Sequence, residues 1–148
     1  MTTQAQTNFS DRVADLKTML AGTVPDKVLN DMVNAVQAAQ TSYPANGSIA
    51  SIVIWQRVQC TITGGKTFNG DSWGLSIPGG GALIGDVYLT GNNTLDTLYA
   101  NTTGFAVTAT PVYTAIYFLD THGSTLGHFP AGSVSIGAGA GGGNGSWQ

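Results

Sequence analysis

Glycine-rich segments punctuate the chain at short and regular intervals from residue 64 onward. They lie at residues 64–65, 69–70, 78–81, 91–93, 122–123 and 141–145. The stretches between them alternate apolar and polar side chains with the period of two that is typical of β-strands. Closure of such strands into a barrel removes the unpaired edges that uncharged strands would otherwise expose. The pattern predicts an all-β fold, a barrel of about seven or eight short strands, rather than a flexible linker.

Two segments indicate how the strands are expected to be buried. Residues 51–62 are expected to form part of one long first strand, with Ile52, Val58 and Ile62 on one face. The other face is polar except at Val53 and Trp55. Residues 112–119 are apolar on both faces, which indicates a strand that is covered on both sides. The barrel interior would cover one face, and the amino-terminal helices or a partner would cover the other.

The amino-terminal zone, residues 1–44, carries most of the helical signal. Ser10 can cap a first helix, which Gly22 would end. Residues 25–41 show a second helical pattern, with Pro25 near its first turn and an apolar stripe at helical spacing. We therefore expect two amphipathic helices that precede a barrel domain, and we place the boundary between residues 44 and 45. The barrel domain would then extend to residue 148.

The second helix is expected to end before Tyr43 and Pro44. Its apolar stripe, which Leu29 and Val33 widen, should dock on the barrel or pair with the first helix. Its polar face lacks the Lys and Arg residues that helices at a membrane surface use. A short helical turn is also expected within the barrel domain, at residues 94–99.

Composition excludes several classes of partner. Only 9% of the 148 residues are charged, against about 25% in ordinary soluble domains. The Lys and Arg residues are few and scattered and the pI is near 4.8, so nucleic acid is not an expected partner. No apolar stretch is long enough for a transmembrane helix, and residues 1–7 do not resemble a secretory signal peptide. Residence in the cytoplasm, another export route and a trimmed signal all stay open.

One cluster carries the residue types of a hydrolase or metal site, and it comprises Asp120, His122, Ser124 and His128. Asp120 and His122 flank Gly123, where these residue types are favoured in a turn for backbone reasons. We therefore expect a turn there, and no catalytic residue, metal or cofactor. A buried neutral His128 would have to become charged on acidification, which makes it the candidate pH-sensitive residue.

The remaining candidates are a cysteine, a glycine loop and aromatic side chains. Cys60 is the sole cysteine, so it excludes an intramolecular disulfide and is expected to pack in a strand. Residues 79–84 lack the Lys and helix start of a phosphate-binding loop and should continue as a strand. Trp147 should pack as a plug beside the glycines at residues 137–145, the alternative being an exposed indole that binds a partner. The candidate anchors of an outward interaction surface are Trp55, Trp73, Tyr113, Tyr117 and Trp147.

Several separated motifs follow one another in the second two thirds of the chain. They are FNGD at residues 68–71, GLSIPGGGALIG at 74–85, LY at 98–99, FLD at 118–120, LGH at 126–128 and GGGNGSW at 141–147. In this order, and over about residues 49–147, they resemble the signature of the rhodococcal virulence-associated protein (Vap) family. The chain differs from that family at Ser72 and Trp73, where small residues are usual, and in its amino-terminal zone.

The resemblance implies a compact, closed, antiparallel eight-stranded β-barrel of Greek-key type that is secreted and has no enzymatic activity. Members of the family support survival inside phagocytes by perturbing endolysosomal maturation, and association with membranes or lipids has been proposed for them. A host membrane lipid or a host endolysosomal protein would then be the partner. The family has no active site to carry over, so the motif residues are expected to build the barrel.

Three functions stay open at this point. The first is a non-catalytic effector that acts on host endolysosomal membranes or on a host protein. The second is a barrel or interaction module with a different target, such as a barrel that holds a small apolar ligand in its mouth. The third is a hydrolase or metal enzyme built on Asp120, His122 and His128. A packed interior would argue against an internal ligand, because it leaves no cavity.

Overall fold

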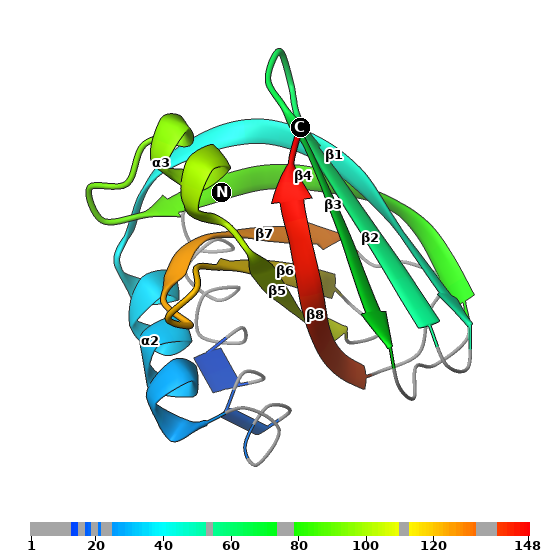
Figure 1. Ribbon diagram of the computed structural model, residues 1–148, viewed down its shortest axis with the longest axis horizontal. Coiled ribbons are helices and arrows are strands. Elements are labelled where there is room, and N and C mark those ends of the chain that lie inside the picture. Colours follow the sequence, from blue (N-terminus) through cyan, green and yellow to red (C-terminus); the bar gives the residue numbers. More distant parts are fainter. Residues whose placement is uncertain are drawn as a thin grey trace.

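The computed structural model describes residues 13–14, 17–18, 21, 25–52, 55–73, 79–109, 113–132 and 139–148. The strands are β1 (Ala39–Ile52), β2 (Trp55–Ile62), β3 (Thr67–Trp73), β4 (Gly79–Thr90), β5 (Gly104–Ala109), β6 (Tyr113–Leu119), β7 (Thr125–Gly132) and β8 (Gly139–Trp147), and the helices are α2 (Asp26–Gln37) and α3 (Leu95–Asn101). The strands wrap into a barrel, with α2 along the outside of one wall and α3 over one end (Figure 1).

The strands close into one antiparallel barrel. Their order around it is β1-β2-β3-β8-β5-β6-β7-β4, and β4 pairs again with β1. In each half of the barrel the fourth strand lies beside the first, because β4 pairs with β1 and β8 pairs with β5. The two halves meet where β3 pairs with β8 and where β4 pairs with β7. The expectation of a closed antiparallel barrel of eight strands is confirmed.

The expected long strand at residues 51–62 proved wrong, because two strands share this segment. Ile52 at the end of β1 pairs with Trp55 at the start of β2, so the chain reverses direction between them. Residues 53–54 are Val and Ile, which carry none of the Gly, Asn or Asp signals that mark a two-residue hairpin. The alternation of side chains therefore gave no sign of the reversal.

The second predicted helix forms, but α2 ends at Gln37 rather than near residue 41. Ala38 closes it by donating its backbone N–H to the carbonyl oxygen of Asn34 at 2.9 Å. The next residue, Ala39, already pairs with Thr90 of β4. Pairing in the sheet thus takes over the backbone groups that a longer helix would have used.

This early start of β1 changes the predicted domain organisation. Tyr43 and Pro44 lie inside β1 rather than after a helix, so the boundary between residues 44 and 45 falls within the first barrel strand. The first predicted helix, at residues 10–22, lies mostly outside the described residues.

The expected helical turn at residues 94–99 is confirmed as α3. Thr94 caps the helix, and its Oγ1 accepts the N–H of Thr97 at 3.2 Å. Leu98 is buried, and Leu95 and Tyr99 pack against the barrel core. Of the two helices within the described ranges, one precedes the barrel and the other lies in mid-chain, which corrects the expectation that both would precede it.

Aromatic and aliphatic side chains fill the barrel interior. Phe68 lies at its centre, with ring centroids 5.0 Å from Phe118, 5.6 Å from Trp147 and 5.8 Å from Phe105. Trp147 is only 6% exposed and belongs to this cluster, so its expected role as a plug is confirmed. Truncation of such a ring to Ala typically lowers the free energy of unfolding by about 3 to 5 kcal/mol. These rings are therefore expected to contribute strongly to the stability of the fold.

The glycines of β8 make room for this cluster and for β3. A Cβ atom on Gly145 would collide with the ring of Phe68, and one on Gly143 would collide with the backbone carbonyl of Asp71. Across the same seam, a Cβ atom on Gly70 of β3 would lie 2.6 Å from Phe105. Real Cβ atoms essentially never lie this close to another heavy atom, so residues larger than glycine would force β3, β8 and the neighbouring rings to shift.

We predict that Gly143→Ala destabilises the fold whereas Gly141→Ala does not. The added methyl group at Gly143 meets rigid backbone atoms of β3, and overpacking of this kind typically costs about 1 to 3 kcal/mol. The nearest atom to a Cβ on Gly141 is Gln56 Oε1 at 3.6 Å, an ordinary contact. Urea denaturation of both variants gives the comparison, and equal stability of the two would contradict the steric argument.

Candidate functional site

The turn between β6 and β7 holds Asp120 in a structural role. Asp120 Oδ1 accepts the backbone N–H groups of His122 and Ser124, each at 2.9 Å. Gly123 has a φ of +81°, a conformation that side chains disfavour. The carboxylate therefore stabilises the turn that the sequence predicted.

The two histidines lie in different environments. His122 is exposed in the turn, whereas His128 is fully buried in β7. The His128 ring is stacked between Tyr88 at 5.4 Å and Tyr117 at 5.8 Å, and these residues are register partners on β4, β7 and β6. The predicted cluster is therefore not gathered into one catalytic constellation. That His128 senses pH stays a prediction.

Helix α2 covers the outer face of the wall formed by β5, β6 and β7. The residues buried in this contact are Leu29, Met32, Val33 and Val36 of the helix, with Ala106, Ala115 and Tyr117 of the sheet. Asp31 adds a polar tie, because its Oδ2 accepts the backbone N–H of Thr125 at 2.5 Å. Docking of the second predicted helix on the barrel is confirmed.

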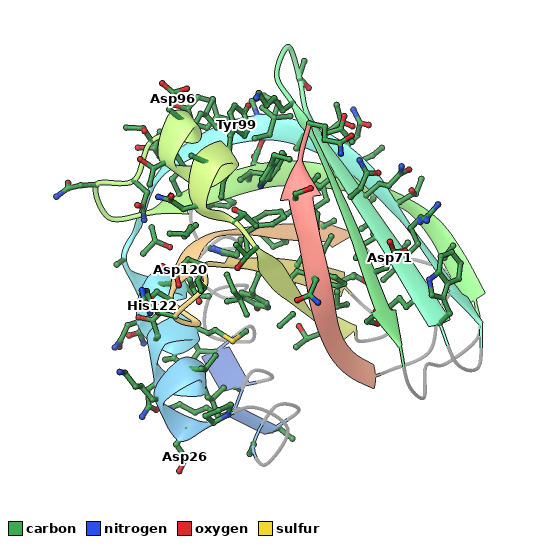
Figure 2. All side chains as sticks on the ribbon, viewed as in Figure 1. Asp26, Asp71, Asp96, Tyr99, Asp120 and His122 are labelled. Atoms are coloured by element: carbon green, nitrogen blue, oxygen red, sulfur yellow. The ribbon has the colours of Figure 1, made fainter. Side chains whose placement is uncertain are left out.

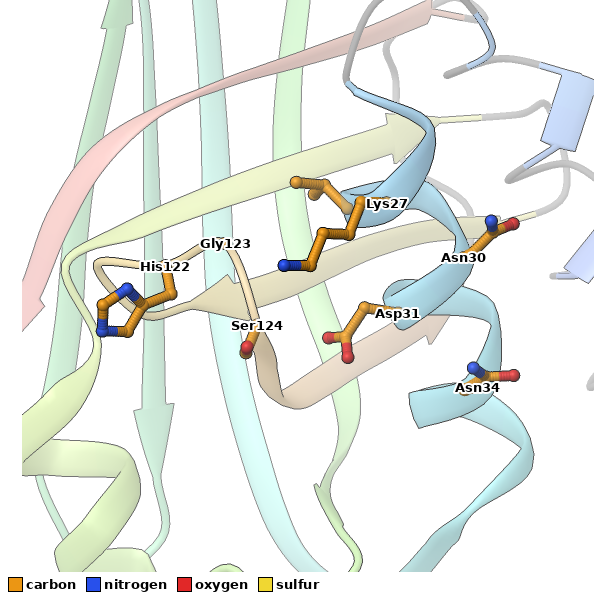
Figure 3. Close-up of a pocket in the computed structure, with 8 residues that line it drawn as sticks. Lys27, Asn30, Asp31, Asn34, His122, Gly123 and Ser124 are labelled. Carbon is orange, nitrogen blue, oxygen red and sulfur yellow. The ribbon is translucent and has the colours of Figure 1, made fainter.

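A polar cleft of about 430 Å³ lies between α2 and the turn that precedes β7. Its lining comprises Lys27, Val28, Asn30, Asp31, Asn34, His122, Gly123 and Ser124. Lys27, Asp31 and Ser124 face the space between helix and turn, while His122, Asn30 and Asn34 point elsewhere (Figure 3). Lys27 and Asp31 bring opposite charges, so the cleft has no net charge that would select an anion or a cation.

Acidic side chains are dispersed over the molecule. Asp71 lies on the opposite side of the barrel from Asp120, and Asp96 lies on α3 at the end of the barrel (Figure 2). Within the described ranges, no three His, Cys or Asp side chains are grouped closely enough to hold a metal ion. In the same part of the chain, no helix combines the length and apolarity needed to cross a bilayer.

The structure changes the set of candidate aromatic anchors. Tyr117 is fully buried beneath α2 and Trp147 lies in the barrel core, so neither can form part of an exposed surface. Trp55 is half-buried, and the guanidinium carbon of Arg57 lies 5.1 Å from its ring centroid. The side chains of Trp73 and Tyr113 lie outside those that the structure describes.

Sequence reasoning missed three features of the outer surface. Ile84 of β4 is 78% exposed, and Asp31 ties α2 to β7. Gln59 and Asn69 form a side-chain hydrogen bond of 2.7 Å between β2 and β3. The alternation of side chains along β2 and β4 could have placed Gln59 and Ile84 on the outer face, but it carries no information about cross-strand partners.

The closed sheet, its filled core and the docked helix α2 define the class of protein. It is a small closed β-barrel protein with a packed interior and one wall covered by a helix. The chain belongs to the family described as Rhodococcus equi virulence-associated protein, whose family model matches residues 2–148. The resemblance seen in the separated glycine motifs is therefore confirmed.

Two solved structures from this family are similar to the chain. The virulence-associated protein VapB of the intracellular pathogen Rhodococcus equi is 37% identical, with a TM-score of 0.66 over 73% of this chain and 96% of VapB. VapD of the same organism is 29% identical, with a TM-score of 0.67 over 74% of this chain and 99% of VapD. No curated protein matches the chain at a significant level.

Met32 offers a direct test of how strongly α2 is docked. Its side chain is fully buried against the barrel wall, so we expect Met32→Ala to lower the free energy of unfolding by about 2 to 5 kcal/mol. Asn34→Ala, on the exposed side of the same helix, should change it by less than about 0.5 kcal/mol. Thermal or urea unfolding measures both, and equal effects would show that the helix is not held by its apolar face.

Cys60 should be chemically inert in the folded protein. Burial raises the pKa of its thiol, because the core disfavours the charged thiolate. We expect no reaction with a thiol reagent such as 5,5′-dithiobis(2-nitrobenzoic acid) near neutral pH, and one equivalent to react after unfolding in guanidinium chloride. Rapid labelling of the native protein would contradict the placement of Cys60 in the core.

Proposed function

We propose that the protein is a secreted, non-enzymatic virulence-associated protein that perturbs the endolysosomal or phagosomal membranes of a host cell, or their maturation. It would do so by associating with membrane lipid or with a host protein. The observation that carries this proposal is membership of the virulence-associated family over residues 2–148. A relative from an intracellular pathogen fits action inside a host-cell compartment.

The chemistry of the candidate residues supports a role without catalysis. Asp120 and Asp31 accept hydrogen bonds from backbone N–H groups, which hold their side chains in place. His128 is enclosed by two tyrosine rings and has no exposed surface. A general base needs to reach a substrate, and the burial of His128 keeps its ring away from one.

The packed interior argues against the alternative of an internal ligand. Phe68, Phe118 and Trp147 occupy the space that a ligand would need in a lipocalin-like barrel. We also take the barrel to be of Greek-key type, since the orders β4-β1-β2-β3 and β8-β5-β6-β7 place each fourth strand beside its first. Association would then occur through the outer surface.

We expect the protein to sediment with liposomes of endolysosomal composition at about pH 7 or about pH 5, or to reduce the acidification of lysosomes in phagocytes. The variant His122→Ala should behave like the native protein in both assays, because the proposed mechanism needs no catalytic imidazole at this turn. Inertness in both assays would overturn the proposal. Loss of the acidification effect in His122→Ala, with its fold intact, would point to chemistry at the turn.

A further inference from the structure

One wall of the barrel has no helix packed on its outer face. Figure 1 shows β1, β2 and β3 on the side of the barrel away from α2. The described helices make their main contacts with other strands, α2 with β7 and α3 with β7 and β8. Along β2, the buried residues Val58, Cys60 and Ile62 alternate with side chains that reach the outer surface. This wall is therefore a sheet surface with which neither described helix makes its main contacts.

Two rows of uncharged polar side chains cross this wall, and the longer one continues onto the neighbouring strand β8. One row follows the strand register through Ser48, Gln59, Asn69 and Ser146, and the second contains Thr61 and Thr67. We call these six side chains the polar wall. The longer row crosses four strands, a distance of about 14 Å at the usual spacing between strands.

Hydrogen bonds between neighbours hold the polar wall in place. Gln59 Nε2 donates to Asn69 Oδ1 at 2.7 Å, and Ser48 Oγ donates to Gln59 Oε1 at 3.4 Å. The hydroxyl groups of Thr61 and Thr67 lie 2.8 Å apart. These bonds leave the N–H groups of Asn69 and one N–H of Gln59 to bind solvent or a ligand. Because the side chains are already ordered, a ligand would lose less entropy in binding them.

None of the six side chains of the polar wall is charged, and few charges lie around it. Arg57 and Asp71, in the adjoining row, form an ion pair with Nε and Oδ1 3.0 Å apart. Lys66, in the turn between β2 and β3, places its ammonium group 5.4 Å from the ring centroid of Tyr99. A surface with a single lysine and one ion pair at its edges attracts phosphate groups or strongly charged peptides only weakly. It is complementary to a neutral molecule that both donates and accepts hydrogen bonds.

An aromatic ring lies at the border of the same wall. Trp55 occupies the outward position of β2 next to Arg57, and it is half-buried with the guanidinium group over its ring. Packing against Arg57 and the sheet fixes the indole while part of it stays accessible. Tryptophan is among the residues that most often anchor a binding surface, since it supplies a large apolar area at little entropic cost.

We propose that the polar wall binds a neutral carbohydrate chain, an oligosaccharide or polysaccharide without charged groups. Its hydroxyl groups match the amides of Gln59 and Asn69 as donors and acceptors, and the apolar face of a sugar ring matches Trp55. The length of the row suits an extended chain of several sugar units rather than a single monosaccharide. This binding is separate from the membrane effect proposed above and does not depend on it.

The first experiment is a glycan array that presents neutral gluco-, galacto- and manno-oligosaccharides beside sialylated and sulfated ones. We expect binding to neutral chains only. Titration of a neutral chain that binds into the ¹⁵N-labelled protein should then shift the amide signals of β2 and β3. No binding to any neutral chain, binding to charged glycans alone, or shifts confined to the α2 side would overturn the proposal.

Variants define which side chains are responsible. Gln59→Ala, Asn69→Ala and Trp55→Ala should each weaken binding by about fivefold or more. Asn92→Ala, which removes an exposed amide from the turn after β4, should leave it unchanged. Far-UV circular dichroism and the melting temperature establish that each variant is folded. If all four folded variants bind the glycan as tightly as the native protein does, the glycan binds elsewhere and the polar wall is not the site.

Experiments with vesicles distinguish binding to carbohydrate from binding to the membrane. Phosphatidylcholine vesicles without sugar test the proposed membrane effect alone, and binding to them should be the same for native protein and Gln59→Ala. Vesicles that carry a neutral glycolipid are compared with the same sugar chain in free form. Binding only to the glycolipid, and never to the free chain, would overturn the assignment to an oligosaccharide or polysaccharide.

Discussion

The close approach of β3 and β8 is the contact on which the rest of the structure depends. It joins the two halves of the barrel at one of their two seams, and it requires that Gly70, Gly143 and Gly145 have no side chains. The space that these glycines leave is taken by Phe68 and Phe105, while Trp147 covers the cluster. Backbone proximity and aromatic packing are therefore one constraint, because neither can be achieved if the other is lost.

Closure divides the outside of the barrel into two unlike walls. The wall of β5, β6 and β7 is apolar and is completed by α2, with small residues such as Ala106 and Ala115 allowing the helix to approach closely. The wall of β1, β2 and β3 meets water through amides and hydroxyl groups that bind one another. With so few charged residues in the chain, this wall meets water mainly through hydrogen-bonding side chains, and the family relationship accounts for the fold rather than for this surface.

Sequence patterns predicted those features that local chemistry controls. The turns at residues 64–65, 91–93 and 122–123, the period of two, the docked stripe of α2 and the burial of Cys60 and Trp147 all follow from propensity and periodicity. The glycine signal at residues 69–70 was misleading, because these residues lie inside β3, where the missing side chain of Gly70 makes room for Phe105. The reversal after Ile52 was missed because Val and Ile give no turn signal, and the end of α2 was misplaced because pairing of Ala39 in the sheet is a long-range effect. Periodicity assigns Tyr117 and Gln59 to outer faces equally well. Only the tertiary structure shows that α2 buries the first and leaves the second exposed.

The position of β8 has a consequence for the order of events in folding. Residues 139–147 follow every other strand in the sequence, yet β8 lies between β3 and β5. Any folding intermediate that lacks β8 must therefore leave the edges of both neighbours unpaired, and the contacts that complete the barrel span a large part of the chain. Pairing between strands so far apart in the sequence is typical of slowly folding domains, and the edges of β3 and β5 stay open to pairing with other chains until β8 is added.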